Sequence, residues 1–323
     1  MIVKSQNIKH HASRLAGTYK RAVVVAIALA VPLATAGLAS PALATPKGEF
    51  AVFADCPLSN PNVHGCIVSK TESGKFIIGK RTVPIENVIT LQGGFEGENP
   101  CNFPFQGKGE CRLPFVGAAD GNTLSKTAQN VPGGLLNLIN CKEITNKGER
   151  ELCEFFFEKG ITAVTATTEL AAPASSIGLS EAALLNPVLS EAFGIPALQL
   201  PVKIKLSNPL FGTKCYIGSE AEPIILNLIT GKTNPPKPNE SITGKIGTFE
   251  SNEAGDILTI SHNSLVDNSF AAPGVNGCGG SFSSLLDPLI DAQLGLPSTA
   301  GHNTAILEGT LKQAGAEAVR ENE

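Results

Sequence analysis

Eight cysteines are the residues of this chain whose type and spacing say most about its chemistry. An even number of cysteines, all beyond residue 50, is typical of a disulfide framework in an oxidising compartment. The cysteine spacing leaves the connectivity open, but it favours three local pairs and one distant pair: Cys56–Cys66, Cys101–Cys111, Cys141–Cys153 and Cys215–Cys278. In the chain-entropy model, each local pair restrains the unfolded chain by about 3 kcal/mol and the distant pair by about 4.

Metal binding is the alternative reading of these cysteines. Structural zinc sites take their ligands from Cys and His pairs a few residues apart. The chain contains no C-x-x-C, and the one histidine within four residues of a cysteine is His64, two residues before Cys66. Asp120-Gly121-Asn122 lacks the full calcium-loop pattern, and no Walker or dinucleotide motif is present. We therefore expect no metal and no other cofactor.

Three histidines beyond residue 44 are candidates for acid–base catalysis: His64, His262 and His302. A Ser-His-acid triad needs an activated serine, and the chain has no G-x-S-x-G motif. Ser180 comes closest, but it is better explained as a helix cap. His302 is the histidine to test first, although the sequence offers it no visible partner. We assign no catalytic residue and keep His302 as a weak candidate site.

Glycoside cleavage needs two convergent carboxylates, and binding of sugars favours aromatic platforms. The sequence supports neither. Glu149, Glu151 and Glu154 lie in a charged stretch typical of a solvated surface, and Tyr216 is the one tyrosine beyond residue 44 in a chain that has no tryptophan.

Fifteen phenylalanines and many aliphatic residues remain. The densest clusters are Phe103-Pro104-Phe105 and Phe155-Phe156-Phe157. Such residues normally form a core. The alternative is that they line an apolar pocket for a lipid or a similar ligand.

The first 44 residues have the pattern of a signal peptide. Five basic residues precede an uncharged apolar run, 22–39, and Ala42-Leu43-Ala44 supplies small residues where a signal peptidase cuts. We expect cleavage after Ala44 and a secreted or cell-envelope protein of residues 45–323. An uncleaved membrane anchor is the alternative, but no stop-transfer pattern follows the run.

The charge balance limits the partners of the exported part. Five of the 25 Lys and Arg residues lie in the first 44 positions and none of the 29 Asp and Glu, so 20 cations face 29 anions and the net charge becomes −9. Nucleic acid and anionic membrane surfaces require clustered cations. No later apolar run is long enough to span a bilayer.

Strand patterns dominate the elements that must position these residues. In residues 199–206, Leu200, Val202, Ile204 and Leu206 lie on one face and Lys203 and Lys205 on the other, which is the period of a half-buried strand. Residues 161–170 alternate as well. Short β-prone runs between 50 and 91 are separated by glycines, and we expect Glu72–Lys75 to be a hairpin tip.

Two helices are expected, at Ser180–Phe193 and Ser283–Leu294. Ser180 is a plausible N-cap of the first, and Pro187 should bend or split it. Each helix contains a proline and is followed by glycine. The polar residues 314–323 are expected to fray.

The two helical regions resemble each other. Residues 184–189 match 285–290, and 194–197 match 295–298, always at an offset of 101. A strand candidate follows each copy, so 184–206 and 285–311 read as a possible helix–strand repeat. Chance similarity of two Leu-Pro-rich helices is the alternative.

Several short motifs also resemble a paralogous group of secreted proteins of unknown function from high-GC Gram-positive (actinobacterial) bacteria. These motifs are Cys56-Pro57 to Cys66-Ile67, Ser73-Gly74-Lys75-Phe76, Val83-Pro84-Ile85, Leu91-Gln92-Gly93-Gly94, residues 164–170, residues 215–219 and Gly301-His302-Asn303-Thr304-Ala305. The resemblance implies export and shared cysteines at Cys56–Cys66 and Cys215–Cys278. It transfers no catalytic residue.

Together these observations predict a mainly β protein: a β-sandwich or irregular β-barrel, stapled by disulfides, with two short helices packed on it. We expect a non-enzymatic binding or structural role outside the cell or in its envelope. The runner-up is a carrier of an apolar ligand such as an envelope lipid. A secreted hydrolase comes third.

Overall fold

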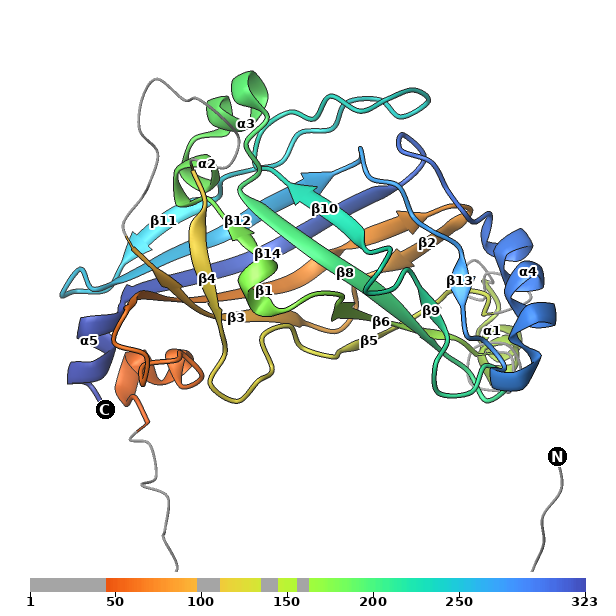
Figure 1. Ribbon diagram of the computed structural model, residues 1–323, viewed down its shortest axis with the longest axis horizontal. Helices are drawn as coiled ribbons and strands as arrows, with labels where there is room; N and C mark the ends of the chain where they lie inside the picture. The colour runs from red at the N-terminus through yellow and green to blue at the C-terminus, as the bar shows by residue number, and fades with distance from the viewer. Residues whose placement is uncertain (1–44, 98–110, 135–144, 156–162) are drawn as a thin grey trace, which may run out of the picture. The chain divides into compact units, whose positions relative to one another are not determined.

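Antiparallel strands are the main regular element of the structure (Figure 1). The computed structural model describes residues 45–97, 111–134, 145–155 and 163–323. The expected signal peptide, residues 1–44, lies outside the described residues. The described strands are β1 Val63–Ile78, β2 Arg81–Pro84, β3 Ile89–Glu96, β4 Leu113–Gly117, β5 Ala128–Asn130, β6 Thr165–Leu170, β7 Gly178–Leu179, β8 Leu198–Ser207, β9 Tyr216–Ile217, β10 Ile224–Leu228, β11 Thr248–Ser251, β12 Ile257–Asp267, β13 Val275–Asn276 and β14 Thr304–Gly315.

The described helices are short. They are α1 Lys147–Cys153, α2 Glu181–Leu185, α3 Pro187–Phe193, α4 Ser283–Leu294 and α5 Ala316–Glu321, with 3₁₀ turns at η1 Gly48–Phe53, η4 Ala174–Ser176 and η5 Gly280–Phe282. Among these helices, none has the length and apolar composition needed to cross a bilayer.

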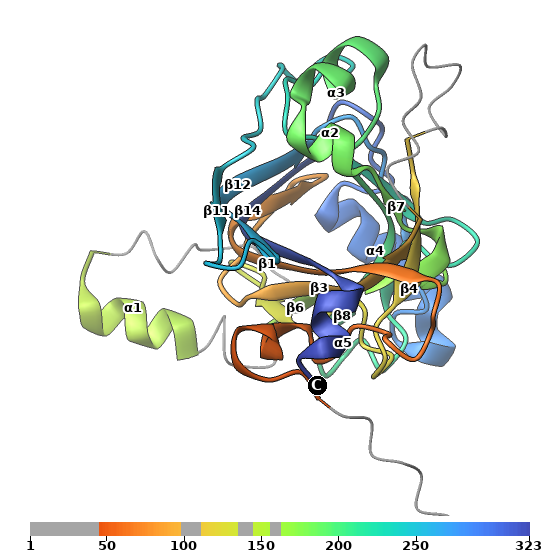
Figure 2. The same ribbon diagram turned by 90° about the vertical axis from the view of Figure 1, so that its left-hand side faces the viewer.

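The sheet closes on itself. Its strands run in the order β12-β14-β1-β3-β4-β7-β8, and β10 pairs with the other edge of β8. Ile229 follows β10 and bridges Val266 of β12 through backbone hydrogen bonds of 3.0 and 2.9 Å. Figure 2 shows β11 and β12 on one side of the resulting ring and β4 and β7 on the other. The predicted mainly β fold is confirmed, as an irregular barrel.

The barrel interior is filled by alternate residues of its strands. In β8 the side chains of Leu200, Val202, Ile204 and Leu206 are buried at 1–6 % exposure, while Lys203 and Lys205 lie on the other face. Burial of each such aliphatic side chain stabilises the fold by roughly 1.5–3 kcal/mol. The period-two pattern of the sequence therefore assigned the two faces of this strand correctly.

The expected hairpin tip at Glu72–Lys75 is wrong. These residues lie inside β1, which continues through a bulge between Thr71 and Ser73. Gly74 is needed there because a Cβ atom would come within 2.0 Å of the Ile306 carbonyl oxygen on β14. The chain turns instead at Gly79 and Lys80, between the paired residues Ile78 and Arg81.

The two predicted packed helices are present. Ser180 caps the first, because its side-chain oxygen accepts a hydrogen bond from the Ala183 N–H. Pro187 splits this helix into α2 and α3, and Asn186 caps the second piece. Both α3 and α4 end at a left-handed glycine, Gly194 and Gly295, and a strand follows each. These strands, β8 and β14, lie in different parts of the barrel and do not pair.

The prediction that residues 314–323 fray is also wrong. Ala316 and Val319 of α5 are fully buried against η1 and β1, in a second small core outside the barrel. Arg320 donates hydrogen bonds to the carbonyl oxygens of Leu58, Asn60 and Val63 at 3.1–3.3 Å. The polar composition of this segment hid the two apolar residues that anchor it.

Two predicted disulfides are present, Cys56–Cys66 and Cys215–Cys278. Cys111 is disulfide-bonded as well. Cys101, Cys141 and the side chain of Cys153 lie outside the described residues, so the pairs Cys101–Cys111 and Cys141–Cys153 stay predictions.

Candidate functional site

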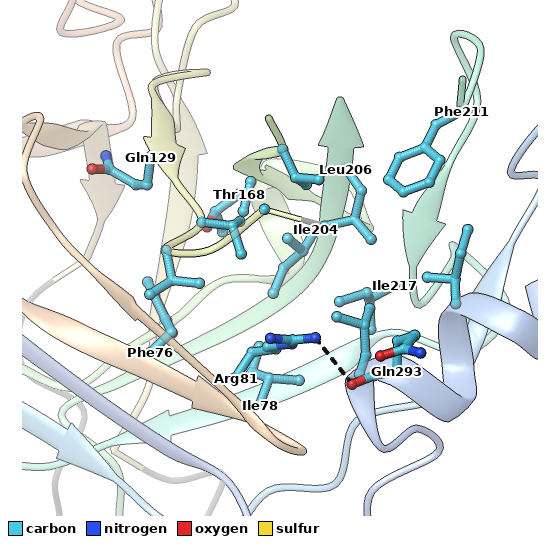
Figure 3. Close-up of a pocket in the computed structure, with 17 residues that line it drawn as sticks. Phe76, Ile78, Arg81, Gln129, Thr168, Ile204, Leu206, Phe211, Ile217 and Gln293 are labelled. Carbon is cyan, nitrogen blue, oxygen red and sulfur yellow. Dashed lines mark hydrogen bonds between the residues drawn. The ribbon is translucent and has the colours of Figure 1, made fainter. Parts of the chain in front are cut away.

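An apolar cavity of about 60 Å³ lies at one end of the barrel interior (Figure 3). The ends of β1, β6, β8 and β9, the short strand β2 and the inner side of α4 supply its walls. Most of the wall is made by apolar side chains, among them Phe76, Ile78, Ile204, Leu206, Ile217 and Ile290. Phe211 and Leu294 also contribute. Apolar cavities with few polar groups are the usual form of a small-molecule site.

Helix α4 is held over this end by its two aspartates. Asp287 accepts hydrogen bonds from the backbone N–H groups of Gly277 and Cys278 at 3.0 and 2.9 Å. Asp291 accepts one from Val275 at 2.7 Å. Burial raises the pKa of Asp291, and the charge of Asp287 acts in the same direction, while the Val275 N–H lowers it. The loop that carries the Cys215–Cys278 disulfide therefore fixes the position of α4.

The β1–β2 turn docks on the C-terminal end of the same helix. The Lys80 backbone N–H donates to the Leu294 carbonyl oxygen at 2.7 Å, and Lys80 Nζ donates to the carbonyl oxygen of Ala292 at 3.2 Å. The last carbonyl groups of a helix lack partners within the helix and attract cations. Gly79 permits this approach, since a Cβ atom there would lie 2.3 Å from the Leu294 oxygen.

Arg81 is the charged residue among the described residues that line the cavity. It begins β2, lines the cavity wall and is only 7 % exposed. Its Nη2 atom donates to the Gln293 carbonyl oxygen at 3.4 Å, whereas Nε and Nη1 find no hydrogen-bond partner among the described residues. In Figure 3 the guanidinium group lies among the labelled apolar side chains. Burial lowers the pKa of Arg81, but a guanidinium group stays protonated in proteins.

Gln129 also lines the cavity, but its polar atoms are used elsewhere. Its Oε1 accepts the backbone N–H groups of Glu86 and Asn87, both at 2.9 Å. Its Nε2 donates to the Asn87 carbonyl oxygen at 2.7 Å. This amide therefore joins β5 to the segment after β2, while Arg81 keeps unused donors.

A second, smaller cavity of about 30 Å³ lies deeper in the barrel. Phe76 and Thr168 belong to the walls of both cavities. Leu91, Leu200 and Leu265 are among the other residues around it. A water molecule needs roughly 10–15 Å³ measured in this way, so the larger cavity has room for about four to six waters.

The structure places the three candidate histidines apart from this cavity. His302 lies in an exposed turn, where its Nδ1 is 3.2 Å from Thr299 Oγ1. His64 Nδ1 accepts the Gly97 backbone N–H, which is a structural contact. His262 is exposed and lies within β12 at a bulge, with a positive φ of 57°. No serine of the described residues is hydrogen-bonded to any of the three rings.

Metal ligands do not gather in the part of the chain that the structure describes. No group of three or more His, Cys, Asp or Glu side chains in it is arranged to hold an ion. In this part of the chain, two of the predicted cysteine pairs form disulfides.

The sequence reasoning missed Arg81. A two-residue hairpin turn pairs Ile78 with Arg81 and Phe76 with Val83, so these four residues face the same side of the sheet. Because Phe76, Ile78 and Val83 are apolar, a hairpin placed at Gly79-Lys80 would have predicted an inward-facing arginine. The hairpin tip was instead predicted at Glu72–Lys75, so the inward-facing position of Arg81 was not recognised.

Comparison of the chain with models of protein families, with curated proteins and with solved structures finds no match. The cavity and its arginine are therefore interpreted from their own geometry.

Proposed function

We propose that this chain is an exported binding protein that holds an apolar small molecule at the α4 end of its barrel and does not act on it chemically. The observation that carries the proposal is the cavity walled by Phe76, Ile78, Ile204, Ile217 and Ile290. It supports the carrier function that the sequence placed second, as a specific form of the binding role placed first.

An unfilled cavity has an energetic cost that a bound ligand would offset. Protein interiors pack at crystal-like density, and an unfilled volume of this size destabilises the fold by about 1–2 kcal/mol. A ligand that fills it replaces the missing contacts. The size of the cavity selects a small ligand, or one short branch of a larger ligand.

A catalytic role has less support at this site. None of the described residues that line the cavity is a histidine, and Arg81, the charged residue among them, is a poor general base because it stays protonated. His302, the histidine that the sequence marks for testing first, lies in an exposed turn and contacts Thr299.

Native and denaturing mass spectra of the protein purified from its own host test the proposal. We expect an additional mass in the native spectrum that disappears on denaturation. Bare polypeptide in both spectra contradicts it and leaves the structural role.

A cavity-filling variant locates the ligand. Ala166 on β6 lines the cavity, so Ala166→Leu should reduce the occupied fraction. Ala128→Leu is the matched control, because Ala128 is exposed on the neighbouring strand β5. Equal occupancy in the two variants would place the ligand elsewhere.

A further inference from the structure

We infer that the ligand carries an anionic head group of the carboxylate class, which pairs with the Arg81 guanidinium inside the cavity. This inference rests on the proposed function and adds the polar half of the ligand to its apolar half. The residues that carry it are Arg81 and the apolar side chains around it.

Arg81 lacks a counter-charge among the described residues. A buried charge is ordinarily paired, because leaving it uncompensated in an apolar environment is costly. Arg81 has no acidic partner among the described residues. The nearby acids of α4 are committed to backbone N–H groups: Asp287 to Gly277 and Cys278, and Asp291 to Val275.

The hydrogen-bonding groups that Arg81 leaves unused are all donors. Arginine offers five N–H donors and no acceptor. The described residues use one donor on Nη2 and leave Nε and Nη1 without partners. The matching ligand atom must therefore accept hydrogen bonds, and a negatively charged acceptor gains most from a guanidinium group in an apolar site.

Water is a poor substitute for such a ligand. A buried water molecule generally makes two to four hydrogen bonds. Most side chains that share the wall with Arg81, such as Phe76, Ile78 and Ile217, provide none, and the polar groups of Thr168 and Gln293 are the exceptions beside Gln129. A water bound to Arg81 would therefore face mainly hydrocarbon, whereas an aliphatic chain attached to a carboxylate would fill that space.

Charge and size favour a carboxylate over a phosphate monoester. One guanidinium group neutralises one negative charge, and a phosphate monoester carries nearly two at neutral pH. The cavity volume of about 60 Å³ also fits a three-atom head group with a short chain better than a phosphate.

The test compares hexanoate with hexan-1-ol, which have the same carbon chain and differ in charge. Binding to the full chain is followed by NMR of the isoleucine δ1 methyl groups. Ile78, Ile204, Ile217 and Ile290 line the cavity, and Ile257 in the outer core serves as the internal reference. We expect hexanoate to shift the cavity methyl groups selectively and to bind more tightly than hexan-1-ol.

Arg81→Met should weaken hexanoate binding about 10- to 100-fold, the loss expected for a hydrogen bond to a charged group, and should leave hexan-1-ol binding unchanged or stronger. Arg81→Lys keeps the charge and should retain part of the preference for hexanoate. Arg112→Met is the matched control, because Arg112 is a half-buried arginine outside the cavity walls.

Equal binding of hexanoate and hexan-1-ol by the unmodified protein, or hexanoate binding unaffected by Arg81→Met, overturns the anionic head group and leaves the apolar site intact. Tighter binding of hexyl phosphate than of hexanoate overturns the carboxylate assignment. If neither six-carbon probe shifts the cavity methyl groups, the proposed function fails together with this inference.

Discussion

The Nη2 atom of Arg81 lies 3.4 Å from the backbone carbonyl oxygen of Gln293, near the end of α4. It joins the first residue of β2 to a helix that begins some 200 residues later in the chain. The contact is long for a hydrogen bond, and it satisfies one nitrogen of a guanidinium group whose other two have no partner among the described residues. Arg81 therefore caps the helix weakly, and its Nε and Nη1 donors remain unused by the described residues.

Arg81→Met should raise the stability of the ligand-free protein. Methionine has a similar length, fills the same apolar space and removes the unpaired donors. We expect the free energy of unfolding to increase by about 1–3 kcal/mol, measured by urea denaturation. A decrease of more than about 1 kcal/mol would mean that the role of Arg81 is to cap α4, because the lost contact to Gln293 would then outweigh the relief of the buried charge.

Phe76→Ala should join the two cavities, because Phe76 belongs to the walls of both. We expect a loss of about 3–5 kcal/mol in stability, together with a preference for longer carboxylates such as decanoate over hexanoate. Phe95→Ala is the control. Phe95 is equally buried but lies in neither cavity wall, so it should lower stability without changing the preferred chain length.

Asp267 should make stability depend on pH. Its side chain is 2 % exposed, and burial raises its pKa although the backbone N–H groups of Asn227 and Ser269 lower it. Above the ordinary aspartate pKa of about 4, the unfolded chain has released the proton that the folded protein still holds. Stability should therefore fall as pH rises from about 4 through the raised pKa of the folded state.

Asp267→Asn cannot titrate and should lack this part of the slope in urea midpoints measured from pH 3 to 7. The comparison uses the slope of stability against pH and not the absolute stability. Asp267 accepts the N–H groups of Asn227 and Ser269 with two oxygens, and asparagine has only one. Asp256→Asn, at an exposed position, is the control. An unchanged slope in Asp267→Asn would assign the pH dependence to another group.

Removal of the Cys215–Cys278 disulfide should affect both stability and the site. The bond spans 63 residues, so the Cys215→Ala/Cys278→Ala variant should lose about 4 kcal/mol in urea denaturation under reducing-agent-free conditions. The Cys278 backbone N–H donates a hydrogen bond to Asp287 of α4 and holds the loop against this helix. The Ile290 methyl signal should therefore also shift when the bridge is removed.

The Cys56→Ala/Cys66→Ala variant is the comparison. Its bond closes a loop of 10 residues and lies in the outer core, so it should lose about 3 kcal/mol and leave the Ile290 signal in place. Identical effects of the two double variants on Ile290 would contradict the positioning of α4 by the longer bridge.

Local features of the structure could be predicted from the sequence because their causes are local. The alternation in 199–206 assigned the inner face of β8, since neighbouring residues of a strand point to opposite sides. Ser180 capped α2 and Pro187 divided the helix through contacts within a few residues. The spacing of the cysteines indicated the pairs Cys56–Cys66 and Cys215–Cys278.

Only the tertiary structure decided where β1 turns, how the barrel closes and which residues face its cavity. Strand β1 runs through Gly74 because β14 approaches it there, and closure depends on Ile229 meeting Val266. The burial of Arg81 depends on α4, which lies far later in the sequence. Each of these outcomes depends on contacts between segments far apart in sequence, and local propensities do not encode them. The sequence alone therefore indicated the mainly β composition, the Ser180 cap and two bridges among the connectivities it left open, while the assembled barrel created the site.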